Sequence, residues 1–161
     1  MTTQAHDENR VGQAAANRRT SLTGLRANSF AAVVMLLIEF GLGSWVNLYA
    51  RLPASDHGRG SFAAFADAVA KGPVGLSLHA LLGTLLIVTA IGAVVRAALV
   101  RRPVLIALAA VALLAIVAAW LSGAKFVGDA SSGASLGMAM ATGIALLAYA
   151  SILLAGTRAS T

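Results

Sequence analysis

Long apolar runs, separated by short polar segments, make up most of the chain. Four such runs lie at residues 29–50, 75–95, 104–121 and 133–155. An α-helix rises about 1.5 Å per residue, so about 20 residues cross the ~30 Å hydrocarbon core of a bilayer. Spans joined by short connections pack most simply beside their neighbours in the chain. The pattern therefore predicts an all-α protein built as an antiparallel bundle of four transmembrane helices.

The polar segments at the two ends of the chain define its predicted domain organisation. Residues 1–27 show no apolar periodicity, which is typical of a disordered tail. Residues 28–156 form the predicted four-helix transmembrane domain, and residues 157–161 form a short C-terminal tail.

The longest predicted loop, at 51–74, contains a short amphipathic pattern. Phe62, Phe65 and Val69 recur at helical spacing, so they lie on one face of a helix. Ser61 is a plausible N-cap and Pro73 ends the pattern. We expect a short helix lying at the membrane surface.

The composition supports a membrane protein and excludes several other classes. Hydrophobic residues make up 58% of the chain and charged residues 11%, against about a quarter charged in soluble domains. The net charge of +6 comes from short clusters beside apolar runs, which is typical of membrane flanks and not of nucleic-acid binding. The chain has no cysteine, which excludes disulfides and iron–sulfur clusters.

Lysine and arginine are unevenly divided between the two sides of the predicted bundle. The N-terminal tail, the 96–103 turn and the C-terminal segment hold eight, and the other two connections hold four. Positive residues accumulate on the cytoplasmic side, so both termini are predicted to be cytoplasmic. Because the composition is rich in Ala, Gly, Leu and Arg, we expect a bacterial inner membrane. Aromatic residues gather near the outer boundary, as an aromatic belt would: Trp45, Tyr49, Trp120 and Phe126.

One carboxylate lies near the middle of the first span. Glu39, Gly43 and Asn47 are spaced four residues apart, so they form one small and polar helix face that we expect to look into the bundle. An ionisable group at this depth is a functional candidate by default, here for proton relay or ion binding. The alternative is a neutral glutamic acid that is hydrogen-bonded to a neighbouring helix and only fixes packing.

His79 lies about one turn inside the outer end of the second span. Counting rise per residue from the boundary places it near the depth of Asn47 and about 10 Å above Glu39. This depth predicts Asn47 as its partner and makes a direct contact with Glu39 improbable. An interfacial histidine bound to Asn47 or to water is the structural interpretation.

The functional interpretation of His79 is axial ligation of a haem, because a neutral imidazole facing a bundle interior is a common haem ligand. A second ligand would have to lie at similar depth. Met138 is our predicted partner in this cofactor-binding pair, with Met140 and His57 as alternatives.

Nothing else in the chain suggests catalysis. Asp56, His57 and Asp67 could form a weak metal site, but no spacing motif supports it and we predict none. The chain contains no P-loop, dinucleotide fingerprint or nucleophile paired with a base. An enzymatic function is therefore not expected.

The segment around His79 resembles one half of the haem A synthase family and other small b-type cytochrome bundles. A span with small residues, Trp45 and Asn47 leads through a long outer loop to His79-Ala-Leu-Leu-Gly83. In those families a histidine followed by a glycine four residues later marks the haem-bearing helix. The resemblance implies haem b at His79, whereas the fourth span contains no histidine. The whole chain also resembles small four-helix bacterial membrane proteins of unassigned function.

These observations leave three hypotheses for the function. The first is a non-enzymatic accessory or structural membrane subunit, whose partners are lipid, other membrane subunits or further copies of the chain. The second is an electron-transfer protein that binds haem b through His79. The third is proton- or ion-coupled transport through Glu39.

Overall fold

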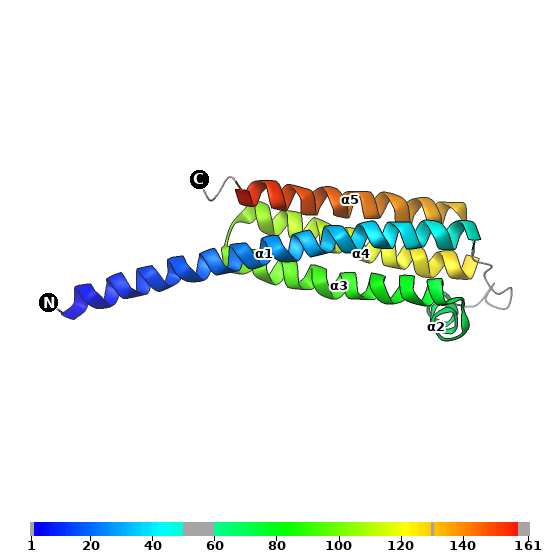
Figure 1. The fold of residues 1–161 in the computed structure, drawn as a ribbon, viewed down its shortest axis with the longest axis horizontal. Coiled ribbons are helices and arrows are strands. Elements are labelled where there is room, and N and C mark those ends of the chain that lie inside the picture. The colour runs from blue at the N-terminus through cyan, green and yellow to red at the C-terminus, as the bar shows by residue number, and fades with distance from the viewer. Residues whose placement is uncertain (1, 50–59, 130, 158–161) are drawn as a thin grey trace.

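The computed structural model describes residues 2–49, 60–129 and 131–157, and the described part contains helices and no strand. Four of the helices are long and lie side by side, and one is short (Figure 1). These findings confirm the predicted all-helical architecture with four long apolar helices. The helices are α1 (Thr2–Tyr49), α2 (Ser61–Lys71), α3 (Val74–Val100), α4 (Pro103–Asp129) and α5 (Ser132–Thr157).

The four long helices form a bundle in which each has two main neighbours. Helix α1 packs against α3 and α5, and α4 packs against the same two helices. In Figure 1 the end of α1, helix α2 and the start of α3 lie together at one end of the bundle. We call this the α2 end, and we call the opposite end, where Val100 connects to Pro103, the turn end.

The exterior of the bundle suits a lipid environment. The segments Arg19–Tyr49, Val74–Val100, Pro103–Gly128 and Ser132–Ala155 are long and apolar enough to cross a membrane. Large apolar side chains point outwards, whereas many of the fully buried residues are small. Small residues let helix backbones approach closely, which drives helix association in lipid. The exposed residues include Leu37, Leu81, Leu114 and Leu147, and the buried ones include Ala90, Ala93, Ala109 and Ala145.

The connection between α3 and α4 is the basic turn that the sequence predicts. Helix α3 continues past Arg96 to Val100, and Arg101 caps it in the left-handed conformation with φ 58°. Pro103 then begins α4, at a helix position where its missing N–H leaves no hydrogen bond unmade.

Helix α4 is longer than predicted. The sequence predicts a polar loop from 122 to 132, but α4 continues to Asp129. Packing on α5 explains the extension, since Gly137 of α5 lies against Ser122 and Gly123 lies against the sulfur of Met138. A polar residue such as Ser122 can therefore lie within α4, because it packs against the neighbouring helix.

The N-terminal segment belongs to α1, which begins at Thr2. The sequence predicts a disordered tail for residues 1–27, and that domain assignment stays a prediction. Figure 1 shows this part of α1 projecting beyond the turn end, and Leu25 is fully buried in the bundle. A helix that is already formed extends at one hydrogen bond per added residue. The segment can therefore be helical without an apolar face of its own.

The short helix in the first long connection is present as predicted. Helix α2 packs against α3 and α4 at the α2 end. Its last turn is tied to α3, because Ser77 Oγ donates a hydrogen bond to the Val69 carbonyl at 2.9 Å. Lys71 forms an ion pair with Asp67 at 3.2 Å on the exposed side.

Candidate functional site

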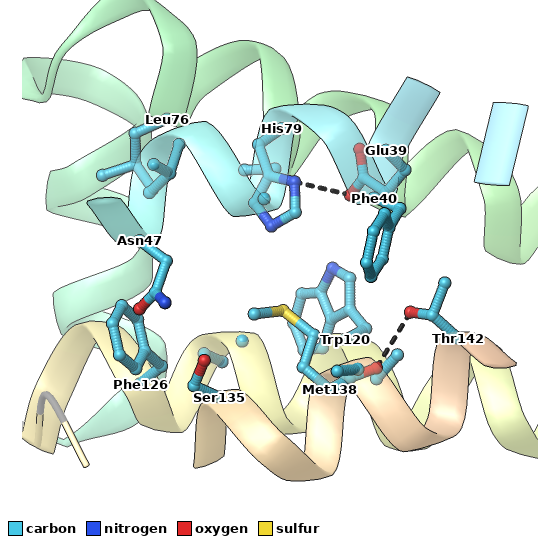
Figure 2. Close-up of a pocket in the computed structure, with 18 of the residues that line it drawn as sticks. Glu39, Phe40, Asn47, Leu76, His79, Trp120, Phe126, Ser135, Met138 and Thr142 are labelled. Atoms are coloured by element: carbon cyan, nitrogen blue, oxygen red, sulfur yellow. Dashed lines mark hydrogen bonds and ion pairs between the residues drawn. The ribbon is translucent and has the colours of Figure 1, made fainter. Parts of the chain in front are cut away.

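A cavity of about 250 Å³ lies inside the half of the bundle nearest the α2 end, and all five helices contribute to its wall. Four residues that the sequence singles out line this one cavity: Glu39 and Asn47 from α1, His79 from α3 and Met138 from α5 (Figure 2). Met140, the alternative sulfur ligand, is instead largely exposed.

Glu39 and His79 contact each other across the α1–α3 interface. The Oε1 atom of Glu39 lies 3.0 Å from Nδ1 of His79, and their side chains are only 12% and 16% exposed. This contact corrects two predictions, because a direct Glu39–His79 pair was judged improbable and Asn47 was the expected partner. Asn47 lines the same cavity, but Glu39 is the residue at the imidazole.

Two glycines make room for this pair. A methyl group added at Gly43 would lie 3.0 Å from Cε1 of His79, and one added at Gly83 would lie 3.0 Å from Oε1 of Glu39. Each helix therefore presents one functional side chain and, four residues later, the glycine that receives the side chain of the other helix. This reciprocal arrangement places the imidazole at the level of Gly43, one turn deeper than the sequence count predicts.

The pair retains unused hydrogen-bonding capacity. Oε2 of Glu39 is buried without a hydrogen-bond partner, and Nδ1 of His79 is close to Oε1 without the alignment of a hydrogen bond. Figure 2 shows the second ring nitrogen of His79 pointing into the cavity, on the side of Met138. Buried polar atoms without partners are few in folded proteins. The Glu39 carboxylate can therefore accept a hydrogen bond from a molecule in the cavity.

Trp120 connects the cavity wall to α2. Its indole Nε1 donates to Thr84 Oγ1 at 3.3 Å, and its ring centroid lies 4.9 Å from that of Phe65 and 6.0 Å from that of Phe62. Phe65 itself lines the cavity, so α2 closes the α2 end of the site. The sequence places Trp120 in an interfacial belt, and its inward role depends on packing that no local pattern reveals.

The remaining walls combine a few polar groups with apolar side chains. Ser135 and Thr142 of α5 line the cavity beside Met138, and Thr142 Oγ1 donates to the Met138 carbonyl of its own helix at 2.9 Å. Toward the turn end the wall is apolar and consists of Leu36, Leu86 and Ile116.

The possible metal ligands in and beside the first long connection do not form a described site. Asp56 and His57 lie outside the described residues, and Asp67 pairs with Lys71. Among the residues that the structure describes, no group of three or more histidine and acidic side chains could hold a metal ion.

The fold and the site together define a bundle of four long apolar helices with a partly polar internal cavity. Comparisons with known proteins add no relative, since no protein-family model, no curated protein and no solved structure matches this chain. The resemblance of the His79 segment to the haem A synthase family therefore stays a prediction.

Proposed function

We propose that the chain is a multi-pass protein of a bacterial inner membrane, with its four spans antiparallel and both termini in the cytoplasm. The four apolar helices support membrane insertion. The excess of Lys and Arg on the tail and the turn supports the orientation, which places the turn end inside and the α2 end outside.

The absence of native cysteine allows a clean test of this orientation. Arg102 at the turn end and Lys125 near the α2 end are both exposed, so each can be replaced singly by cysteine. A membrane-impermeant maleimide applied to intact cells should label Lys125→Cys, and should label Arg102→Cys only after permeabilisation. The reverse pattern would overturn the orientation.

Within this topology, we infer a non-enzymatic protein that binds a small and largely apolar molecule in the cavity. The observation that carries this proposal is the Glu39–His79 pair, which lines the cavity while Oε2 of Glu39 has no hydrogen-bond partner within the protein. A pair that served only packing would need no cavity beside it. Binding pockets commonly combine an apolar wall with a few placed polar groups. An accessory-subunit role is compatible with ligand binding and stays a prediction.

The test uses neopentylbenzene as a neutral apolar probe and Trp120 as the reporter. The protein is reconstituted in lipid nanodiscs as a Trp45→Phe variant, because the chain contains two tryptophans. We expect a saturable change in Trp120 fluorescence. The absence of any saturable change in the folded protein would overturn the binding proposal.

A cavity-filling variant provides the specificity control. Ala80 lines the cavity, whereas Ala98 of the same helix faces outwards. Ala80→Leu should abolish the saturable fluorescence change and Ala98→Leu should preserve it. If Ala80→Leu fails to fold, Ala119→Leu fills the cavity from the α4 wall instead.

Haem b is the second candidate ligand. The observation in its favour is that His79 and Met138 line the same cavity while Glu39 Oε1 lies 3.0 Å from Nδ1 of His79. Metal-bound histidines commonly have a carboxylate at the other ring nitrogen. The cavity volume of about 250 Å³ lies below the ~300–1,000 Å³ of typical ligand pockets, and a porphyrin would need the helices to move apart. A Soret band that shifts in His79→Ala would establish haem binding and replace our first proposal.

A further inference from the structure

We infer that the ligand of this cavity is an apolar organic cation held by Glu39. The inference rests on the proposed ligand-binding function and specifies its chemistry. The cavity would then select ligands that carry one positive charge, and not apolar molecules in general.

The first observation is the isolation of the carboxylate. Among the described residues that line the cavity, Glu39 is the only one with an acidic side chain, and His79 is the only one that can become positively charged. The Oε2 atom is buried and without a partner. A positively charged group of a ligand would satisfy this oxygen by a salt contact, or by a hydrogen bond if it carries an N–H.

The second observation is the aromatic content of the wall. Phe40, Phe65, Trp120 and Phe126 line the same cavity as Glu39, and Figure 2 shows Phe40, Trp120 and Phe126 around the space that Glu39 and His79 face. The faces of aromatic rings attract cations, most strongly when the cation is desolvated. An alkylammonium group with apolar substituents therefore suits both the carboxylate and its surroundings.

The third observation is the charge of the carboxylate. A carboxylate inside a bilayer is costly unless it is paired, and the neighbour of Oε1 is Nδ1 of His79 at 3.0 Å. A cation bound beside Oε2 would balance the charge of the carboxylate inside the cavity.

Charges on the other helices do not change this balance. On α2, Asp67 is paired with Lys71, and on α4, Lys125 is exposed and outside the cavity wall. The described part of α5 contributes no charged residue, and on α3 Arg96 lies near the turn end, where it bonds to Asn28 of α1. Among the described residues, Glu39 is therefore the negative group available to a cation in the cavity.

The experiment compares two probes of the same shape. Benzyltrimethylammonium carries a positive nitrogen where neopentylbenzene carries a neutral carbon, and both are titrated into the Trp45→Phe protein in nanodiscs of zwitterionic lipid. We expect the cation to bind more tightly than its neutral isostere.

Two variants connect this behaviour to the pair. Glu39→Gln should weaken cation binding at least tenfold more than it weakens neopentylbenzene binding. His79→Gln should retain cation binding. Ala98→Leu, on the lipid-facing side of α3, is the matched control and should behave as the parent protein does.

The possible failures are distinguishable. If neopentylbenzene binds and the cation does not, the cation inference is overturned while the proposed ligand-binding function stands. If neither probe binds, the proposed function itself fails. If the cation binds equally well to Glu39→Gln, the assignment of charge recognition to Glu39 is wrong.

Discussion

The imidazole of His79 on α3 lies 3.0 Å from the carboxylate of Glu39 on α1, inside a bundle of apolar helices. Neither group is fully satisfied by the other, because Oε2 of Glu39 has no hydrogen-bond partner. The pair forms a contact between α1 and α3, and Oε2 of Glu39 stays available to a ligand. The same two side chains therefore take part in helix packing and in the proposed ligand binding.

The pair should be energetically coupled. Replacing either Glu39 or His79 by alanine leaves the other group buried without its partner, and we expect each single variant to lose about 1–3 kcal/mol of stability. The double variant should lose less than the sum, by at least ~0.5 kcal/mol. Unfolding in a mixed detergent series gives the free energy of unfolding of the parent protein, the two single variants and the double variant. Strict additivity would show that the two side chains do not stabilise each other.

Gly43 should not tolerate a side chain, because its added methyl group would press on the His79 ring. We expect Gly43→Ala to lower stability by about 1–3 kcal/mol through overpacking. Gly41 is the matched control on the same helix, since a methyl group there meets no atom within 4 Å. Gly41→Ala should be neutral or stabilising by up to ~1 kcal/mol through helix propensity. Equal effects at the two positions would contradict the proposed fit of Gly43 to the imidazole.

Trp120 should hold α2 on the bundle through its contacts with Phe62 and Phe65. Aromatic pairs contribute about 0.5–1.5 kcal/mol each beyond burial. Trp120→Ala should therefore increase hydrogen exchange of the Ser61–Lys71 amides about tenfold or more. Trp45→Ala is the control, because the ring of Trp45 pairs with Tyr49 of its own helix and lies over Gly75 of α3. Unchanged exchange in Trp120→Ala would show that other contacts hold the helix.

Asn28 should link α1 to α3 near the turn end. Its Nδ2 donates to the Thr89 carbonyl at 3.1 Å, and its Oδ1 accepts from Arg96 at 3.2 Å. Interhelical hydrogen bonds in membranes contribute about 0.6 kcal/mol each and at most ~1.7. We expect Asn28→Ala to cost about 0.5–2 kcal/mol in the same unfolding assay. Thr89→Val should cost less, because the Thr89 hydroxyl bonds within its own helix. A larger loss of stability in Thr89→Val than in Asn28→Ala would show that Asn28 does not link the two helices.

The residues of the site could be found from the sequence, but their pairing could not. Glu39, Asn47 and His79 are conspicuous because polar groups are rare in apolar spans. Counting residues from the membrane boundary placed His79 too near that boundary. The count did not include the packing of α2 on α3 and α4, or the two glycines that let the side chains of Glu39 and His79 meet. The contact of Trp120 with α2 could likewise not be predicted, so the sequence placed Trp120 in an aromatic belt.

The sequence by itself determined that the protein is helical and has four long apolar helices, because hydropathy and helical rise act locally and each span shows them independently. It also singled out four residues that line the cavity, which are Glu39, Asn47, His79 and Met138. Only the tertiary structure decided that Glu39 meets His79, that Trp120 faces inwards and that a cavity lies between them. Those features depend on the depth and rotation of each helix, which are set by small-residue packing between segments distant in the chain.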